Sequence, residues 1–269
     1  MLRIDEVALA NTRCLYEYRQ NCNYKITFNI KGFDYGWLLT SHRWKSGEKV
    51  LDVGGAYSPF PNYLSTKFNC ETWVADDFGV SEGSAFWTRG RSPEEHIVTH
   101  PETKYVLERI GDPTQTSLPK AYFDTIYSAS ALEHVPPAFT PAVWTHMVEL
   151  LKPGGELIHA VDVPFPSNGG FKKMLQAMIF DGFPWLFPHS FRVNHFLATP
   201  KNYARIVFKT LNIYTRPSLK NLNIWRMSLN PEILCEPVIA GWYRITKDNM
   251  KDYHFQRVGS LLLRFKKLS

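Results

Sequence analysis

Residues 49–60 read KVLDVGGAYSPF, and this stretch decides the fold. An apolar run of β-type residues leads to Asp52 and then to a turn of small residues. This composition is typical of a buried parallel strand followed by a loop that cradles a ligand. Glycine and alanine let the backbone approach a ligand closely, and in open α/β sheets ligands bind at the carboxyl ends of strands. By itself the stretch is a weak signal, so its weight depends on the elements that follow it.

The chain after this stretch alternates between strand and helix patterns. Strands are predicted at 50–53, 72–75, 105–110, 123–128 and 156–163, and crossover helices at 60–68 and 141–151. Such alternation predicts a parallel sheet with right-handed crossovers. Two further β-type runs, at 241–246 and 258–265, are expected to pair antiparallel and close the edge of the sheet.

The rest of the chain is expected to surround this core as parts of one domain of 269 residues. Residues 2–20 predict an amphipathic helix, and a second helix is expected from Tyr35 to about Lys45, so that 1–45 forms a helical lid over the core at 46–163. Residues 164–198 are rich in aromatic side chains and predict a cap insertion. Residues 199–269 predict a helix followed by sheet-edge strands.

Composition excludes several classes of protein. The chain is 44% apolar and 14% aromatic, which indicates a globular protein rather than a disordered one. Apolar runs stay short of the roughly 18 residues that span a bilayer, and the first residues lack the apolar centre of a signal peptide. Four scattered cysteines without a C-x-x-C pair predict free thiols in a reducing compartment. We therefore expect a cytoplasmic protein without a membrane span.

The net charge of +6 is concentrated near the end of the chain, where residues 201–269 hold 13 Lys/Arg and 4 Asp/Glu. A basic region of this kind could bind nucleic acid or an acidic small substrate, and the alternative is a solvated surface. Apart from the pair at 266–267, the charges are spread singly. A nucleic-acid partner is therefore not expected.

Five elements in order resemble the class I S-adenosylmethionine-dependent methyltransferases, closest to the small-molecule, type 11-like subgroup. The resemblance covers residues 46–165 and lies in Asp52-x-Gly54-x-Ala56-x-Ser58, Asp76, Gly111-Asp112, the run FDTI…LEHV at 123–135, and LLKPGG at 150–155. The family's first loop has three glycines, and two of them are other small residues here. The resemblance implies a Rossmann-like seven-stranded, mostly parallel sheet with an antiparallel edge strand, helices on both faces and cap insertions.

The resemblance also implies where the cofactor S-adenosylmethionine would lie. Asp52 and the amides of Gly54 and Gly55 would hold its amino-acid end. Tyr57 and Tyr127 could lie near the sulfonium, since aromatic faces attract cations. Methyl transfer would leave S-adenosylhomocysteine as the product.

Later elements of the sequence would bind the other end of the cofactor. Asp76, with Asp77 as a substitute, could accept hydrogen bonds from the ribose hydroxyls, as acidic residues do in dinucleotide folds. Asp112 is suited to the amine of adenine, with Pro113 against the ring. Both pairs have structural alternatives, because Asp-Pro is a common turn and an aspartate can cap a helix. The cofactor set is completed by Ser128 and Glu133.

A nicotinamide dinucleotide site is the alternative for the first loop. That site needs Gly-x-Gly-x-x-Gly before a helix, so that the pyrophosphate rests on the helix N-terminus. Here Gly54-Gly55 is followed by Pro59 and Pro61 without a third glycine. The loop therefore fits a dinucleotide poorly.

Methyl transfer requires an aligned nucleophile, exclusion of water and, for an attacking oxygen, a base. The candidates are His134, Asp162 and His195, with His189 and Asn194 also in the aromatic insertion; surface or structural roles are the alternative for each histidine. Asp162 with one of the insertion histidines could bind a divalent cation. The sequence has no tight ligand cluster, so we expect no metal.

The sequence thus predicts an enzyme that methylates a hydroxyl oxygen of a small molecule, such as a phosphorylated or nucleotide-linked sugar. An N-methyltransferase of small molecules and an RNA or protein methyltransferase are the enzymatic alternatives. A scaffold that binds the cofactor without catalysis is the alternative from another class. The sequence leaves a homodimer open.

Overall fold

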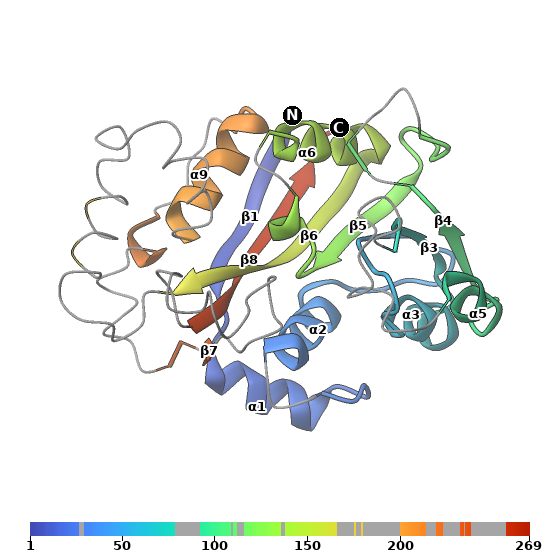
Figure 1. Ribbon diagram of the computed structural model, residues 1–269, viewed down its shortest axis with the longest axis horizontal. Coiled ribbons are helices and arrows are strands. Elements are labelled where there is room, and N and C mark those ends of the chain that lie inside the picture. Colours follow the sequence, from blue (N-terminus) through green and yellow to red (C-terminus); the bar gives the residue numbers. More distant parts are fainter. Residues whose placement is uncertain are drawn as a thin grey trace.

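The computed structural model describes residues 1–26, 30–78, 92–108, 110–111, 116–135, 138–165, 175, 179, 200–213, 219–222, 232–233, 235–237 and 257–269. Within them, one sheet has the strand order β1-β8-β6-β5-β2-β3-β4, and the short β7 pairs with β8 (Figure 1). None of the helices in this part of the chain is long and apolar enough to cross a membrane.

In the part of the chain that the structure describes, five strands of the sheet are parallel. They are β4 (Thr103–Val106), β3 (Glu71–Ala75), β2 (Lys49–Val53), β5 (Phe123–Ala129) and β6 (Leu151–Phe165). The next strand, β8 (Arg257–Lys267), is antiparallel to β6, and β7 (Cys235–Pro237) is antiparallel to β8. The predicted seven-stranded, mostly parallel Rossmann-like sheet is confirmed, and β7 adds a short eighth strand.

The N-terminal segment differs from its prediction. Residues 2–9 form β1 (Leu2–Leu9), an edge strand antiparallel to β8, and not the start of a helix. The antiparallel strand β8 therefore lies one place inside the edge, and the two ends of the chain lie side by side (Figure 1). A register shift between Ile4 and Glu6 explains the error. Because of this bulge, apolar residues at 2, 4, 7 and 9 pack on one core, although their spacing also fits a helix.

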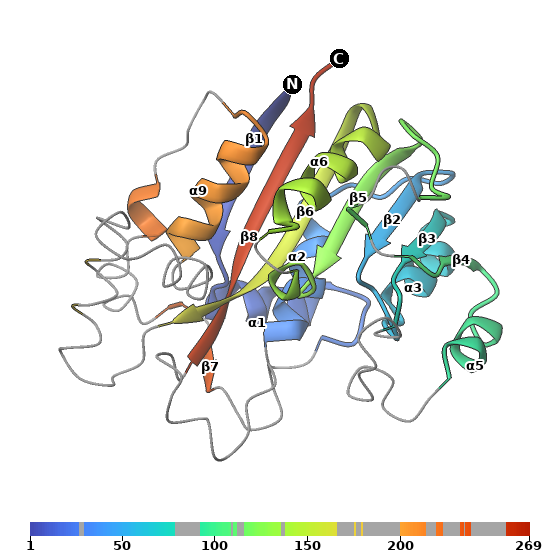
Figure 2. The ribbon, with the colours of Figure 1, turned by 45° about the horizontal axis from the view of Figure 1, so that its top comes forward.

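Helices cover both faces of the sheet (Figure 2). Leu157 and Leu261 face α6 (Thr140–Leu150) and α9 (Pro200–Thr210), whereas their neighbours Ile158 and Leu262 face the opposite side. That side holds α1 (Thr12–Asn21), α2 (Ile30–Ser41) and α3 (Phe60–Phe68). Side chains alternate between the faces of a strand, so β6 and β8 each contribute to two separate cores.

The remaining helices are short: α5 (Pro93–Val98), η2 (Leu132–His134) and η4 (Leu219–Leu222). The predicted strand at 241–246 lies outside the described residues, as does the predicted aromatic cap apart from residues 164–165, 175 and 179.

The strand order reverses between β2 and β5. From β2 the chain adds β3 and β4 on one side, and from β5 it adds β6 on the other. Open α/β sheets bind ligands outside the carboxyl ends of strands at such a switch point. The segments that leave β2, β3, β5 and β6 therefore define the candidate site.

Candidate functional site

The loop after β2 is built around a glycine in the left-handed region. Gly54 has φ 77° and donates its amide to the Ala75 carbonyl at 3.0 Å, which joins the ends of β2 and β3. The Ser58 amide closes the turn by donating to the Gly55 carbonyl at 2.8 Å. Ala56 also has a positive φ, 38°, at a position where the resembling family has glycine. The loop keeps a glycine-like path in spite of that substitution.

Asp76 fixes this loop to the end of β3. Its carboxyl accepts a hydrogen bond from the Ala56 amide at 3.0 Å and one from the Phe78 amide at 2.5 Å. An ionised carboxylate has about four acceptor sites. A carboxylate at the end of this strand is the type of group that accepts hydrogen bonds from the vicinal hydroxyls of a ribose.

Asp52 is the last but one residue of β2 and is 3% exposed. Burial raises the pKa of its carboxyl to about 8, and the neighbouring Asp76 adds to the rise, whereas Tyr127 and Lys31 oppose it. Gly55 lies so close to Asp52 that any side chain on Gly55 would overlap the carboxyl. A buried carboxyl with this pKa is poised to gain charge when a cationic group approaches it.

The loop is covered by α2. The hydroxyl of Tyr35 lies 3.0 Å from Oγ of Ser58, and its ring stacks on Phe60 with 4.9 Å between centroids. Ser58 Oγ in turn accepts from the Phe60 amide at 3.2 Å, near the start of α3. The second helix of the chain is thus connected directly to the candidate cofactor loop.

An aromatic group borders the loop on the β3 and β4 side. The ring of Tyr57 lies 4.9 Å from Phe78 and 5.1 Å from His96 of α5, centroid to centroid. His96 Nε2 lies 3.1 Å from the hydroxyl of Tyr105 on β4. Tyr57 therefore lies among aromatic rings, while Tyr127, the other predicted sulfonium neighbour, is fully buried beside Asp52.

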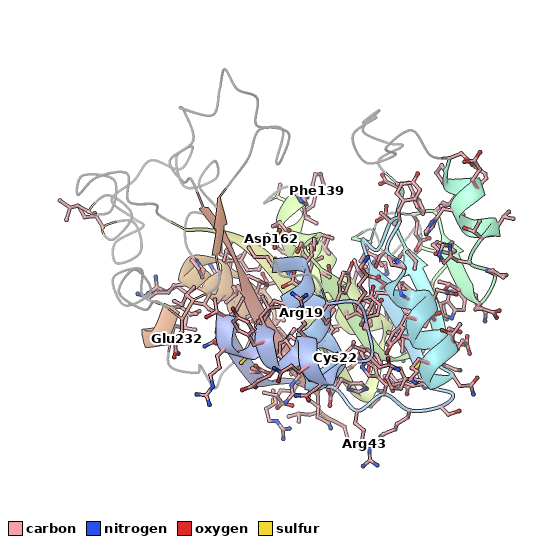
Figure 3. The ribbon with its side chains drawn as sticks, turned by 90° about the horizontal axis from the view of Figure 1, so that it is seen from below. Arg19, Cys22, Arg43, Phe139, Asp162 and Glu232 are labelled. Carbon is pink, nitrogen blue, oxygen red and sulfur yellow. The ribbon has the colours of Figure 1, made fainter. Side chains whose placement is uncertain are left out.

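A second polar group lies at the ends of β5 and β6. Ser130 has φ 52°, and its hydroxyl lies 3.0 Å from Asp34 Oδ2 and 2.8 Å from Asp162 Oδ1. A hydroxyl has one proton to donate. Ser130 therefore donates to one of the two carboxyls at a time and links Asp34 to Asp162. Asp162 lies beside the α2 ribbon in Figure 3.

Lys31 connects this group to Asp52. Its Nζ donates to the Ala129 carbonyl at 2.9 Å. Burial acts to lower the pKa of Lys31, but the charges of Asp162, Asp34 and Glu133 and the hydroxyl of Tyr35 outweigh it, so the pKa is raised. Burial, followed by the charge of Asp162, raises the pKa of Asp34 to about 7.

Glu133 is the third carboxyl of the group. It is 5% exposed, and burial and then the charge of Asp162 raise its pKa well above the usual value. Neither of its carboxyl oxygens has a hydrogen-bond partner among the described residues. Its own amide lies nearby without the geometry of a hydrogen bond, and His134 Nε2 lies 3.8 Å from Oε1. His134 itself is about one-third exposed.

The structure therefore brings the predicted residues together in two groups. The first joins the loop after β2 to Asp76, and the second joins Glu133, His134 and Asp162. Asp77 follows directly after Asp76 and is half-buried. Ser128 is buried on the α6 side of β5, paired in register with His159. Five predicted residues lie outside the described part of the chain: Asp112, Pro113, His189, Asn194 and His195.

Three residues of the site were missed in the sequence: Lys31, Asp34 and Ser130. The predicted second helix began at Tyr35, whereas α2 begins at Ile30 and so includes both charged residues. A signal was present, because Lys31 and Asp34 interrupt an otherwise apolar helix that buries Phe33 and Trp37. Charged residues are rarely buried without a partner or a function.

No metal site is apparent in the described ranges, where no three His, Cys, Asp or Glu side chains are arranged to hold an ion. Cys14, Cys22 and Cys70 are free thiols.

A parallel sheet with a glycine turn and acidic strand ends at its switch point defines the class of Rossmann-like cofactor-binding domains. Within that class, the model of the methyltransferase domain family matches residues 37–223. The chain belongs to this family, which confirms the resemblance seen in the sequence. The comparison with curated proteins gives no match.

The chain is similar to several solved methyltransferases at low identity. The phosphoethanolamine N-methyltransferase 2 of Haemonchus contortus, crystallised with S-adenosyl-L-methionine, is 13% identical with a TM-score of 0.47; the match covers 95% of this chain and 57% of that one. The geranyl diphosphate C-methyltransferase of Streptomyces coelicolor is 12% identical with a TM-score of 0.45, over 86% of this chain and 74% of that one. A putative sarcosine dimethylglycine methyltransferase of Galdieria sulphuraria is 14% identical with a TM-score of 0.40, over 83% and 80% of the two chains. The present chain thus spans little more than half of the first of these proteins.

Proposed function

We propose that this protein transfers a methyl group from S-adenosylmethionine to a small molecule. The observation that supports the proposal best is the bond between Asp76 and the Ala56 amide, which joins the glycine loop to the acidic end of β3 at the switch point. In this proposal Asp76 binds the ribose. Asp52 and the amides of Gly54 and Gly55 bind the amino-acid end of the cofactor.

The charges around Lys31 support a cationic cofactor. Four carboxyls interact with this one ammonium group, those of Asp52, Asp34, Glu133 and Asp162. Buried carboxyls without matching positive charge are costly. S-adenosylmethionine carries a sulfonium and an ammonium group against one carboxylate, so its net charge is complementary to the site. The product S-adenosylhomocysteine has lost the sulfonium charge, which would weaken its attraction to the carboxyls.

The proposal also concerns the chemical group that accepts the methyl group. A hydroxyl acceptor, as predicted from the sequence, needs a base within hydrogen-bond reach. Asp162 and Asp34 are two candidates. Burial raises the pKa of Asp34 to about 7, and a base whose pKa lies near neutrality is efficient. His134 is a third candidate. The surplus of buried carboxyls also supports the alternative acceptor, an amine, because a protonated amine would neutralise part of it.

The predicted phosphorylated or nucleotide-linked sugar depended on the basic C-terminal third of the chain. Three of its basic residues bond to neighbouring elements. Arg264 donates to the Ser41 carbonyl, Lys267 donates to the Val148 and Leu151 carbonyls at 2.7 and 2.6 Å, and Lys266 lies 3.6 Å from Glu156. These contacts favour a structural role for part of the positive charge.

Calorimetry with S-adenosylmethionine and S-adenosylhomocysteine tests the cofactor, and transfer of a tritiated methyl group to mixed small-molecule acceptors tests the activity. We expect binding of both ligands and label in a small product. Absence of cofactor binding would refute the proposal. Binding without transfer to any acceptor class would favour the scaffold alternative. Label in RNA, with binding that weakens steeply as salt rises, would favour an RNA methyltransferase.

A further inference from the structure

Three carboxyls from separate elements converge at the ends of β5 and β6. Asp34 comes from α2, Glu133 from η2 and Asp162 from β6, and we call them the carboxyl cluster. Ser130 lies between two of them, within 3.0 Å of Asp34 Oδ2 and 2.8 Å of Asp162 Oδ1. Asp34 is fully buried and Glu133 nearly so. These segments are far apart in the sequence, so the fold itself assembles the cluster.

The cluster has acceptor atoms that the described residues leave unused. Both carboxyl oxygens of Glu133 are buried without a hydrogen-bond partner among these residues. Lys31, the ammonium group next to the cluster, already donates to the Ala129 carbonyl and is shared with Asp52. Because nearly all buried polar groups in native proteins have a partner, each exception calls for an explanation. A ligand that brings both donors and positive charge would supply one.

The position of the cluster relates it to the methyl acceptor. The predicted cofactor contacts, at Asp52 and Asp76, lie on the β2 and β3 side of the switch point. Glu133 and Asp162 lie on the β5 and β6 side. A cofactor bound along the first side would leave the second side for its reaction partner.

We propose that the carboxyl cluster binds the protonated amino group of the methyl acceptor, so that the substrate is a small primary or secondary amine. This inference rests on the proposed methyltransferase function and narrows it. An ammonium group offers two or three N–H donors and a positive charge, whereas a hydroxyl offers one donor and no charge. Hydrogen bonds between charged partners are about twice as strong as neutral ones.

The reaction that follows balances in two steps. A cluster carboxylate accepts one N–H proton from the bound ammonium group, which leaves a neutral amine and a carboxylic acid. The nitrogen lone pair then forms a bond to the methyl carbon, and the carbon–sulfur bond breaks with its electron pair going to sulfur. The products are the methylated ammonium ion and a neutral thioether. The pKa of Asp34, which burial raises to about 7, suits a group that must accept a proton near neutral pH.

Binding of two cofactor analogues tests for a cation site next to the reacting methyl group. Sinefungin carries an amine at the place of the sulfonium methyl, and S-adenosylhomocysteine carries nothing there. We expect the wild-type protein to bind sinefungin at least tenfold more tightly than S-adenosylhomocysteine, as measured by calorimetry. Asp162→Asn and Glu133→Gln should reduce that ratio toward one, and Asp162→Asn should leave the affinity for S-adenosylhomocysteine within about threefold. Circular dichroism shows whether each variant is folded.

Glu149→Gln is the matched control. It removes a carboxyl on α6 that pairs with Lys120 at 3.0 Å, outside the cluster, and should leave the ratio unchanged. If both ligands bind and neither cluster variant changes the ratio, the amine site is refuted while the proposed function stands. If neither ligand binds, the proposed function itself fails.

The acceptor is tested with matched amines and alcohols on the protein saturated with S-adenosylhomocysteine. By ligand-observed NMR, benzylamine should bind at least tenfold more tightly than benzyl alcohol. Ethanolamine should likewise bind at least tenfold more tightly than ethylene glycol. The preference should be lost in Asp162→Asn. An amine that binds no more tightly than its alcohol would overturn the inference.

Discussion

Gly54 and Ala131 close the space between the carboxyl ends of β2 and β5. A Cβ on Gly54 would overlap the Cβ of Ala131, and Gly54 already requires φ 77°. This contact sets how closely the cofactor loop approaches the segment that leads to Glu133. The spacing of the two halves of the candidate site thus depends on the absence of one side chain.

Gly54→Ala should therefore destabilise the protein beyond the backbone cost alone. Gly47 provides the matched control, because it has the same φ of 77° and a Cβ added there would meet no atom within 4 Å. We expect Gly47→Ala to lower the free energy of unfolding by about 1–2 kcal/mol, because of the left-handed backbone. Gly54→Ala should lower it by about 1–3 kcal/mol more, because of overpacking. Urea unfolding measures both. Equal losses would mean that the contact with Ala131 relaxes freely, and Ala131→Gly should rescue Gly54→Ala if it does not.

Asp76→Ala should weaken cofactor binding by about 1–3 kcal/mol, or roughly 5–150-fold, by calorimetry. The variant removes two hydrogen bonds that hold the loop and the proposed contact to the ribose. Asp77→Ala is the control, since the two residues were alternatives for the same role. A larger loss of cofactor affinity for Asp77→Ala would indicate that Asp77, and not Asp76, contacts the ribose.

Asp52→Asn should stabilise the ligand-free protein at alkaline pH. The folded-state pKa of about 8 lies above the usual value of about 3.9, so the favourable contribution of the protonated carboxyl is complete below pH 4 and is lost as pH rises toward 8. We expect the free energy of unfolding to rise by about 1–4 kcal/mol at pH 8 and by less at pH 5. Cofactor affinity should fall at the same time.

Asp124→Asn serves as the control for Asp52. Asp124 pairs with Lys152 at 2.7 Å at the opposite end of the sheet and is more than one-third exposed. Its removal should change stability by less than about 0.5 kcal/mol at either pH. A gain for Asp52→Asn that is as large at pH 5 as at pH 8 would contradict the assigned ionisation.

His42→Gln should destabilise the protein most between about pH 5 and 6.5. Its ring lies 2.7 Å from Glu48 Oε1 and 3.2 Å from Glu156 Oε2. Burial acts to lower the pKa of His42, but hydrogen bonds to Glu156 and Glu48 outweigh it and raise the pKa to about 9. Its contribution is therefore complete below the unfolded value of about 6.5 and is lost as pH rises through 9.

The two glutamates set the lower limit of this window. Their pKa values are lowered, so their contribution is present above about pH 4.5 and is lost as pH falls through the folded-state values. We expect a loss of about 1–3 kcal/mol for His42→Gln at pH 6 and a smaller loss at pH 9.5, measured by urea unfolding. An equal loss at both values would indicate that packing, and not charge, explains the effect.

Local pattern was sufficient for most of the parallel core, although the strand predicted at 105–110 is found at Thr103–Val106. The first crossover helix was predicted at 60–68 and found at Phe60–Phe68, and the strands on either side were predicted within one residue. Buried strands and their short connections carry strong periodicity and turn signals, so their neighbours in the sequence define them. The prediction for the edge strand β1 was wrong, because its bulge gives strand residues a spacing that also fits a helix.

The sequence by itself determined the parallel sheet, its glycine loop and acidic strand ends, and the resemblance to the methyltransferase family. Those features depend on residues that are close together in the chain. Only the tertiary structure decided that the N-terminal strand completes the sheet and that Lys31, Asp34 and Glu133 meet Asp162. Asp34 and Ser130 are 96 residues apart and make contact because α2 packs against β5 and β8. Burial there raises the pKa of Asp34 and Glu133, and burial is a property that no local pattern contains.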